Sequence, residues 1–274
     1  MPELPEVETT RAGLRPYMEK RTIQSVTIHR TDLRYPVSQK LPTILSGLFL
    51  DEITRRGKYL LFHCKRDNDP CGGLLWHLGM SGSLRLATNS QPLKLHDHIE
   101  IRTEEYCLRY NDPRRFGFVL WVDDFKTNAL LTRLGPEPLS RSFSSHYLYR
   151  RIRKKKLSIK QVVMDYKIVV GIGNIYANEA LFKAGIHPLT ASNEITSEQC
   201  TTLVHAIKAV LRHALAKGGT TLKDFLQPDG KPGYFRDQLY VYGRANLPCL
   251  KCAAIIVSDV IGQRSTFWCP RCQK

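Results

Sequence analysis

The C-terminal cysteines constrain the fold of this 274-residue chain more than any other feature. Cys249 and Cys252 form one C-x2-C pair, Cys269 and Cys272 form a second, and sixteen residues separate the two pairs. Each pair can supply two sulfurs from one tight turn, so two turns close a tetrahedral shell around zinc. Because that shell leaves no vacant position, we expect a structural metal. Two disulfides or a redox-active C-x2-C motif are the alternatives.

The residues between the two cysteine pairs predict a β-hairpin. The stretch "AAIIVSDVIGQRSTFW" has short apolar runs on both sides of "GQRS", which would form the tip. A ribbon of this size has little core and depends on its metal to fold.

The rest of the chain has two kinds of pattern. After "MPEL", Val7, Thr10, Leu14 and Met18 recur at helical spacing. From Thr22 to about residue 124, short apolar or alternating segments are broken by Gly, Pro and Asp, which favours a β-sandwich over a parallel α/β sheet. These segments are "TIQSVTI", "LFLDEI", "KYLLFHC", "GLLWHL", "SGSLRLA", "HIEIRT", "YCLRY" and "GFVLWV".

The pattern becomes helical after "RLGPEPLSRSF", which is typical of a linker. Five segments predict helices: "SSHYLYRRIRKKK", "SIKQVVMDY", "NIYANEALFKAG", "TSEQCTTLVHAIKAVLRHALAKGG" and "TTLKDFL". We therefore predict an α+β multidomain protein. Its domains are a β-sandwich with an N-terminal helix at 2–130, a linker and helical domain at 131–237, and a zinc finger with a β-hairpin at 238–274.

The charge of the chain indicates a polyanionic partner. Forty-one Lys and Arg residues against 25 Asp and Glu give a formal net charge of +16, and no amphipathic basic helix favours a membrane over nucleic acid. No apolar run is long enough to span a bilayer. The opening residues do not resemble an export signal, so we expect a cytoplasmic protein whose other four cysteines are free thiols.

Candidate site residues lie at the mouth of one predicted strand and in two predicted turns. Lys58 in "RRGKYLL" stands at the mouth of an apolar strand, where a gatekeeper at a sheet edge is the ordinary interpretation. Met80 lies between glycines in "HLGMSGS". Arg114, Arg115 and Phe116 in "NDPRRFGF" combine an aromatic wedge with two cations, which can enter a DNA stack while holding phosphates.

Other segments could contact phosphates. His96 in "KLHDHIE" lies near a second histidine, but no third metal ligand is evident, so phosphate or structural hydrogen bonds are favoured. The run "RRIRKKK" at 150–156 is either a solvated face or a phosphate contact. Asn174 in "VVGIGNIYANEALF" is predicted to cap a helix whose N-terminus can hold a DNA phosphate. Arg264, at the tip of the predicted hairpin, is a solvated turn residue or a phosphate ligand.

The opening "MPELPEVETT" points to a reactive chain terminus. Removal of Met1 would leave Pro2 with a free secondary amine, and α-amines titrate near 7.7–8.0, against about 10.4 for lysine. Such an amine can attack a sugar C1′ and form an iminium that acidifies the C2′ proton. Glu3 is placed to shuttle protons in that reaction.

Taken together, these motifs resemble the bacterial formamidopyrimidine-DNA glycosylases, a family that repairs 8-oxoguanine. The resemblance runs the whole length of the chain. It rests on "PELPEVET", "GKYL", "HLGMSGSLR", "KLHDH", "DPRRFG", "LGPEPL", "VVGIGNIYANEALF", "GGTTLKDF", "GKPGYF", "VYGR" and the terminal cysteines. It implies a helix–two-turn–helix domain between the sandwich and the zinc finger, with DNA in the cleft between two lobes.

The resemblance also implies a role for each motif. Pro2 would be the Schiff-base nucleophile and Glu3 the general acid and base. Lys58 would assist β-elimination or hold phosphates, and Arg264 would grip the phosphates around the lesion and be linked to δ-elimination. The wedge would consist of Met80, Phe116 and Arg114, with Arg114 facing the orphaned cytosine, while His96, Lys155 and Asn174 would contact the DNA backbone.

The function implied is that of a bifunctional glycosylase and AP lyase acting on oxidised purines in duplex DNA. We expect a monomer with one structural zinc and no catalytic metal, and a loop at 218–235 over the extruded base. The endonuclease VIII family shares the fold but acts on oxidised pyrimidines and usually opens "PEGPE", unlike this chain. A non-catalytic protein that binds DNA damage would not need Pro2 or Glu3.

Overall fold

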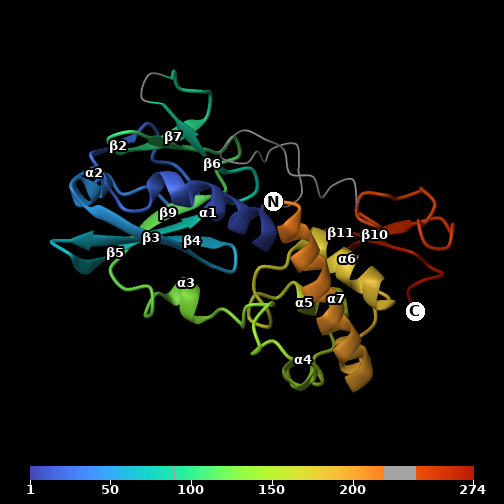
Figure 1. The fold of residues 1–274 in the computed structure, drawn as a ribbon. Coiled ribbons are helices and arrows are strands. Elements are labelled where there is room, and N and C mark those ends of the chain that lie inside the picture. Colours follow the sequence, from blue (N-terminus) through green and yellow to red (C-terminus); the bar gives the residue numbers. More distant parts are fainter. Residues whose placement is uncertain (89–90, 219–238) are drawn as a thin grey trace. The chain divides into compact units, whose positions relative to one another are not determined.

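A computed structural model describes residues 1–88, 91–218 and 239–274, which fall into two compact units (Figure 1). Unit 1 consists of 1–132 with 217–218, and unit 2 of 133–216 with 239–274. The predicted helix "TTLKDFL", and all of the expected loop at 218–235 except its first residue, lie outside the described residues. None of the described helices is long and apolar enough to cross a membrane.

Unit 1 begins with helix α1 (Leu4–Met18). Glu3 is its N-cap, and the Glu3 N–H donates to Glu6 Oε2 over 2.8 Å as part of a capping box. The residues predicted to share its apolar face are all buried. A capping box fixes the direction in which the chain enters the helix, so the terminus ahead of Leu4 has a defined position.

Two antiparallel sheets follow, and their apolar faces share one core. The first sheet has the order β1-β3-β4-β5-β9 and the second β2-β7-β8-β6, which confirms the predicted two-sheet domain. The strands are β1 (Arg21–Thr22), β2 (Ser25–Ile28), β3 (Phe49–Arg56), β4 (Tyr59–Arg66), β5 (Asp69–His77), β6 (Ser83–Ala87), β7 (Asp97–Arg102), β8 (Cys107–Asn111) and β9 (Phe118–Val122).

Two details of this domain differ from the sequence-based expectation. The segment "TIQSVTI" contributes to two strands, because the Ile23 N–H bonds to Leu48 O beside one sheet and the Gln24 N–H bonds to Arg102 O beside the other. The chain therefore crosses between the sheets at this point. A short helix, α2 (Leu41–Leu45), was not predicted, since five residues are too few to display a helical period.

Most of the helices in the described residues belong to unit 2. Helix α3 (Ala129–Thr132) ends the first segment of unit 1. Unit 2 contains α4 (Ser145–Ile152), α5 (Ile159–Val163), α6 (Asn174–Ala184), a 3-10 turn (Ser192–Glu194) and α7 (Ser197–Ala216). Ser144 and Ser158 cap α4 and α5 through their hydroxyls. Helix α4 ends at Ile152, so the last three lysines of "RRIRKKK" follow the helix instead of extending it.

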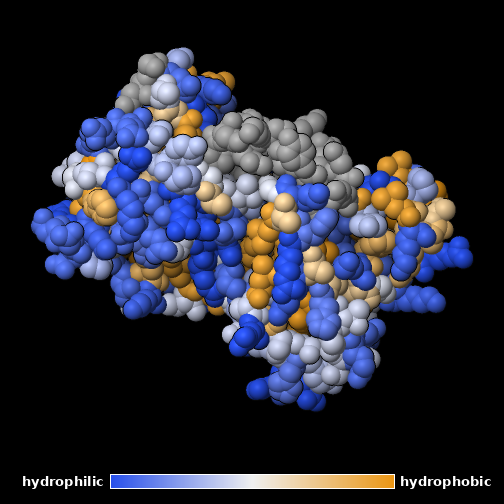
Figure 2. Space-filling view, viewed as in Figure 1, coloured by the Kyte–Doolittle hydropathy of each residue, from blue (hydrophilic) through white to orange (hydrophobic). Residues whose placement is uncertain are grey.

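The chain ends in the predicted hairpin, formed by β10 (Val257–Ile261) and β11 (Arg264–Trp268). A two-residue turn joins the strands, and β11 packs against α6. Four of the five β10 residues are exposed. Figure 2 shows apolar side chains gathered over this part of the chain, and Ile255 and Val260 are among its exposed apolar residues. The hairpin thus has little apolar core of its own.

Candidate nucleic-acid interface and metal centre

The chain terminus is held at the start of α1. Pro2 and Glu3 are both buried, and the capping box with Glu6 ties Glu3 to the first turn of the helix. Met1 still precedes Pro2, so removal of Met1 is what would free the amine. The nucleophile and the carboxylate predicted from the sequence therefore lie next to each other on fixed backbone.

Lys58 lies in the two-residue turn between β3 and β4. Gly57 adopts a φ of +58°, a conformation that favours glycine in such turns. Arg55 supports the turn by donating from Nη1 to Gly57 O over 3.0 Å, and its Nε pairs with Glu8 Oε2 at 2.8 Å. Because Glu8 belongs to α1, this ion pair ties the Lys58 turn to the helix that begins at the chain terminus.

His77, which the sequence did not single out, lies close enough to Lys58 to be affected by its charge. Loss of hydration, with the positive charges of Lys58 and Arg34, lowers the pKa of His77 to about 3. The imidazole is therefore neutral at physiological pH, and its Nδ1 accepts the Gly79 N–H over 3.0 Å. His77 opens the "HLGMSGSLR" motif, but the motif does not reveal its environment, which comes from strands that pair across the sheet.

The structure brings the predicted wedge residues together. Met80 lies in the turn after β5, and Arg114 and Phe116 lie in the loop between β8 and β9. Gly79, with a φ of +70°, packs so closely against Phe116 that an added Cβ would overlap the Phe116 backbone. The Arg114 guanidinium lies 5.0 Å from the centre of the Phe116 ring, and both side chains are exposed.

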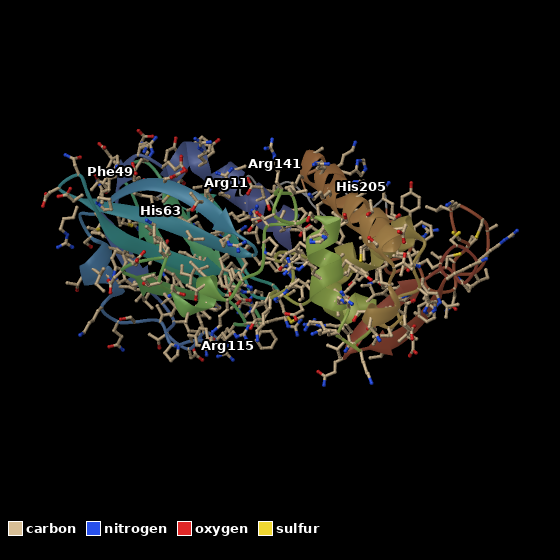
Figure 3. All side chains as sticks on the ribbon, turned by 90° about the horizontal axis from the view of Figure 1, so that it is seen from below. Arg11, Phe49, His63, Arg115, Arg141 and His205 are labelled. Atoms are coloured by element: carbon tan, nitrogen blue, oxygen red, sulfur yellow. The ribbon has the colours of Figure 1, made fainter. Side chains whose placement is uncertain are left out.

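Arg115 points to a different partner from its neighbours. It has a φ of +58°, and its guanidinium pairs with Asp32, which also pairs with Arg30. Figure 3 shows Arg115 on a different side of unit 1 from Arg11 of α1. Arg115 was predicted to bind DNA together with Arg114, but in this structure a carboxylate already pairs with its charge.

The "HDH" motif divides its histidines between two environments. His98 is buried, and its Nε2 donates to the backbone oxygen of Asp112 over 2.8 Å. Asp97 is also buried; it pairs with Arg85 and accepts the Lys94 N–H. His96 is exposed, with a φ of +70°. Of these three side chains only that of His96 is exposed, so it is the one available to a phosphate.

In unit 2, polar contacts dock the C-terminal hairpin onto the helices. Buried Lys160 on α5 donates from Nζ to Ser265 O over 3.1 Å and to Thr266 Oγ1 over 2.6 Å. From α6, Asn174 Nδ2 donates to the same Ser265 oxygen over 2.8 Å. These bonds hold the first residues of β11, and Arg264 is exposed at the tip beside them.

The predicted cap of α6 was wrong by one residue. Gly173 occupies the N-cap position and Asn174 is the first helical residue. The Asn174 side chain is free of the capping role and instead reaches the hairpin, a contact across 91 residues that local spacing could not reveal. Lys155 lies in the turn after α4 and is partly exposed, and its backbone oxygen accepts a hydrogen bond from Ser192 Oγ over 2.8 Å.

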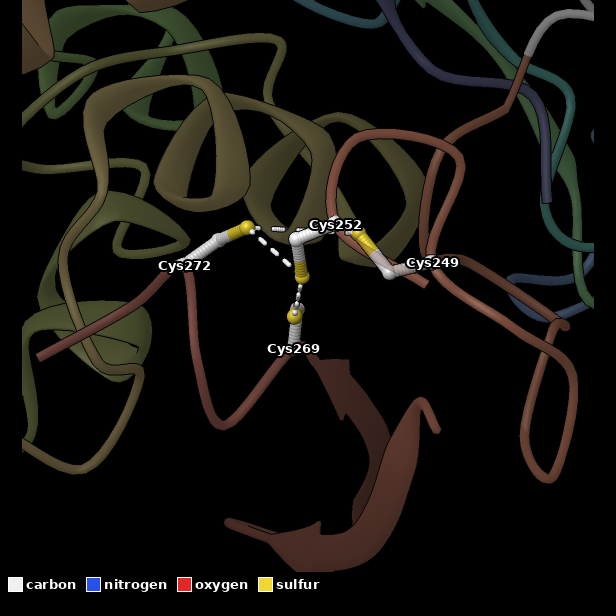
Figure 4. Close-up of side chains that lie close together, drawn as sticks. All are labelled: Cys249, Cys252, Cys269 and Cys272. Carbon is white, nitrogen blue, oxygen red and sulfur yellow. Dashed lines mark hydrogen bonds between the residues drawn. The ribbon is translucent and has the colours of Figure 1, made fainter. Parts of the chain in front are cut away.

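The four C-terminal cysteines converge on one point (Figure 4). Their sulfurs all lie within 4.8 Å of one another, with separations of 3.4 Å for Cys252–Cys269 and 4.0 Å for Cys249–Cys272. A tetrahedral zinc with Zn–S bonds of about 2.3 Å requires S–S edges of about 3.8 Å. Hydrogen bonds from the Ala254 N–H and from the other three cysteines lower the pKa of the Cys252 thiol to about 7, whereas burial raises the pKa of Cys269 and Cys272. Cys252 is therefore the thiol most readily deprotonated to bind zinc.

Family models and relatives at high identity match this chain along its length. Residues 1–119 match the formamidopyrimidine-DNA glycosylase N-terminal domain, 134–225 match the H2TH domain of the same enzymes, and 246–274 match a zinc finger found in FPG and IleRS. A formamidopyrimidine-DNA glycosylase of Haemophilus influenzae is 50% identical, over 100% of this chain and 99% of its own length. The chain belongs to the formamidopyrimidine-DNA glycosylase family.

Solved structures of this family have the same fold. The MutM (Fpg) protein of Thermus thermophilus is 38% identical, with a TM-score of 0.88 over 99% of this chain and 98% of its own. The Lactococcus lactis Fpg in complex with DNA containing an abasic site is 32% identical, with a TM-score of 0.91 over 99% of both chains. The zinc-finger match and the four converging sulfurs also identify one structural zinc in this member of the family.

The sequence patterns did not reveal the buried residues whose hydrogen bonds hold the exposed loops and the hairpin in place. Ser81 and Asp112 are buried among the loops that carry the wedge, and Lys160 is buried beneath the hairpin. The only signal in the sequence was adjacency, since Ser81 follows Met80 and Asp112 precedes "PRRF". Their partners come from distant segments, which spacing alone does not identify.

Proposed function

We propose that this protein is a bifunctional DNA glycosylase and AP lyase that excises oxidised purines, 8-oxoguanine and formamidopyrimidines, in base excision repair. The observation that carries the proposal is the Pro2–Glu3 terminus, buried and fixed at the start of α1. The full-length identity of about half to the Haemophilus enzymes supports it. So do the Lactococcus lactis Fpg complexes with DNA containing an abasic site and with DNA containing Fapy-dG.

The reaction begins at the amine of Pro2. Its nitrogen attacks the sugar C1′, and the bond from C1′ to the damaged base breaks. The sugar ring then opens at the C1′–O4′ bond, whose electron pair leaves with O4′, and an iminium joins enzyme and sugar. The positive iminium acidifies the C2′ proton, and Glu3, next in the chain, moves protons to and from the sugar. Loss of the C2′ proton expels the 3′-phosphate by β-elimination.

Two cations serve the later steps. Lys58, on the turn tied to α1 by the Arg55–Glu8 pair, assists β-elimination or holds the adjacent phosphate. Arg264 holds the phosphates around the lesion and promotes δ-elimination, which expels the 5′-phosphate. Water then releases the enzyme from the sugar fragment.

Damaged duplex DNA is the proposed partner. Extrusion of a base costs a few kcal/mol, and the exposed side chains of Arg114 and Phe116, with Met80, fill the space that it leaves. Four further residues are proposed to contact the DNA backbone: His96, Lys155, Asn174 and Arg115. For Arg115 the DNA phosphate would have to compete with Asp32, which pairs with its guanidinium. We propose a cytoplasmic monomer, associated with the nucleoid on DNA, with domains at 2–130, 131–237 and 238–274.

Borohydride trapping tests the proposal. With duplex DNA containing 8-oxoguanine opposite cytosine, borohydride should reduce the iminium and crosslink the protein through Pro2. The Pro2→Gly variant, or protein that retains Met1, should trap much more slowly. Trapping at the wild-type rate by either variant would remove Pro2 as the nucleophile.

The same assay distinguishes the endonuclease VIII alternative. A Lactococcus lactis Fpg complex contains DNA with an oxidised pyrimidine, so a duplex with thymine glycol belongs beside the 8-oxoguanine duplex. Faster excision of 8-oxoguanine is expected. Faster excision of thymine glycol would replace the purine assignment, and binding of either duplex without excision would favour a non-catalytic damage-binding protein.

A further inference from the structure

The carboxylate of Asp112 is fully buried and accepts hydrogen bonds from three separate segments of unit 1. Its Oδ1 accepts from Ser81 Oγ over 2.7 Å, and Ser81 follows Met80 in the turn after β5. Its Oδ2 accepts from Tyr110 OH over 3.0 Å and from the Gly117 N–H over 2.9 Å. One side chain therefore joins the Met80 turn to both ends of the loop that carries Arg114 and Phe116.

The backbone of Asp112 makes further contacts with the same surface. Its N–H donates to His96 O over 3.2 Å, and its carbonyl accepts from the Arg115 N–H over 3.2 Å. The carbonyl also accepts from His98 Nε2 over 2.8 Å, and because a carbonyl only accepts, this nitrogen carries the proton. The loop with His96 thus shares its anchor with the Arg114–Phe116 loop.

Ser81 extends the network to the wedge itself. Its hydroxyl donates to Asp112 and accepts the backbone N–H of Arg114 over 3.3 Å. Ser81 is 4% exposed, so water does not compete for these bonds. The chain of bonds from Asp112 through Ser81 ends at the residue whose side chain lies over the Phe116 ring.

The hydroxyl of Tyr110 acts as a hydrogen-bond donor to Asp112. Burial and the negative charge of Asp112 raise the pKa of the Tyr110 phenol, which therefore stays protonated and donates. Gly117 packs against this phenol so closely that an added Cβ would overlap the hydroxyl oxygen. The loop can approach the core this closely only because residue 117 has no side chain.

We propose that Asp112 and Ser81 are positioning residues that hold the Met80 turn, the Arg114–Phe116 loop and His96 in one arrangement before DNA binds. Both side chains are buried, so they act through the exposed residues and do not touch DNA. Pre-ordering removes the conformational-entropy cost of the side chains and loops that binding would otherwise immobilise. The inference rests on the proposed function, because it assigns the ordered loops to base extrusion.

The test uses Ser81→Ala, which removes one hydroxyl, with Ser81→Thr to restore it. Ser83→Ala is the matched control, since Ser83 is a partly exposed serine of the adjoining strand β6. Single-turnover cleavage is measured on duplexes with 8-oxoguanine opposite cytosine and on duplexes with a pre-formed abasic site. Amide hydrogen exchange at Arg114 and Gly117 is measured on the same proteins without DNA.

Ser81→Ala should slow 8-oxoguanine excision about tenfold, equal to roughly 1.4 kcal/mol, and leave abasic cleavage within about twofold of wild type. Exchange at the Arg114 amide should accelerate, and Ser81→Thr should restore both properties. Asp112→Asn should accelerate exchange at Arg114 and Gly117. Should Asp112→Asn fail to fold, the Ser81 variants still decide the question.

Two results would overturn the inference. One is unchanged exchange at Arg114 in Ser81→Ala, which would show that the network does not order the loop. The other is equal slowing of abasic and 8-oxoguanine substrates, which would place Ser81 in the chemistry. A wild-type protein that cuts neither substrate refutes the proposed function instead, and hydrogen exchange still decides whether the two residues order the loops.

Discussion

The hairpin tips that carry Lys58 and Arg264 are built alike but supported differently. Each has a two-residue turn that begins with a glycine at positive φ, +58° for Gly57 and +56° for Gly262. Lys58 is the second residue of its turn, whereas Arg264 directly follows its turn as the first residue of β11. The first turn extends from a five-stranded sheet over a large apolar core. The second extends from a two-stranded sheet whose outer strand is mostly exposed.

The comparison shows that the same turn geometry can be stabilised either by apolar burial or by a metal site with polar contacts. Apolar burial fixes the Lys58 tip, and the Arg55–Glu8 pair adds a tie to α1. The Arg264 tip depends on four cysteines and on polar contacts from buried Lys160 and from Asn174. Burial is spread over many side chains, whereas a metal site or a buried ammonium can be lost through one change. We therefore expect the second tip to be the more fragile.

The largest expected effects come from replacing the cation at each tip, because the two cations are proposed to act in different elimination steps. Arg264→Ala should slow δ-elimination by about 10²–10³-fold and leave the β-elimination product, because loss of one positioned donor to the charge that develops on a leaving group costs about that much. Lys58→Ala should slow β-elimination instead, and both variants should still be trapped by borohydride. Denaturing gels that resolve the two products measure the outcome.

Controls for these variants come from exposed cations of the same units, Lys126→Ala and Arg271→Ala. If Lys58→Ala weakens DNA binding without changing the product ratio, its role is to hold phosphate. If Arg264→Ala gives the wild-type product ratio, the link to δ-elimination is wrong.

Removal of zinc should affect only the second tip. Structural zinc supplies about 10–16 kcal/mol of apparent folding free energy in isolated zinc fingers, so chelation or Cys249→Ser should disorder the hairpin. Loss of the Arg264 and Asn174 contacts should weaken DNA binding at least about hundredfold, or roughly 2.7 kcal/mol.

The β-sandwich, which has its own core, should unfold at an unchanged temperature in the zinc-free protein. Metal analysis, calorimetry and DNA titration measure these effects. Retained DNA affinity after full zinc loss would show that the hairpin is supported without its metal, and the comparison of the two tips would fail.

Lys160→Met should destabilise the Arg264 tip less than removal of zinc does. It leaves Ser265 O and Thr266 Oγ1 without the ammonium and should cost about 1–3 kcal/mol. Lys183→Met is the control, because Lys183 is an exposed lysine on the neighbouring helix α6. The Lys160→Met variant should release zinc faster than the control variant or the wild type. A chromogenic chelator measures the rate of release. Equal zinc release from both variants would show that the buried ammonium does not hold the hairpin.

The smallest effect is expected at the first tip and depends on pH. Burial would raise the pKa of Glu8, but hydrogen bonds from Arg11 and Arg55 outweigh it and lower the pKa. As pH falls below the unfolded value of 4.5, the unfolded chain binds the proton first, so the stability contributed by Glu8 is lost.

Glu8→Gln should lower the unfolding free energy by at most about 1 kcal/mol at pH 7, since the pair is partly exposed. The difference from wild type should shrink as pH falls toward 3. Urea unfolding at several pH values measures it. A constant difference across this range would show that the Glu8 charge does not stabilise the tip.

Much of this protein was predictable because its signals are local. The spacing of Cys249, Cys252, Cys269 and Cys272 indicated the metal site, and the shift from alternating to helical periods indicated the order of domains. Local spacing also placed Arg114 and Phe116 on one loop. Each of these inferences needs only the geometry of a turn, a strand or a helix.

Only the tertiary structure decided which residues support these features. Spacing misplaced the cap of α6, and it missed the salt bridge that directs Arg115 to Asp32, 83 residues away. It also missed Asp112, whose carboxylate accepts hydrogen bonds from the Met80 turn, from β8 and from Gly117, the residue before β9. Such contacts form when sheets and loops pack, and a buried polar group keeps the partners that packing supplies because water cannot replace them.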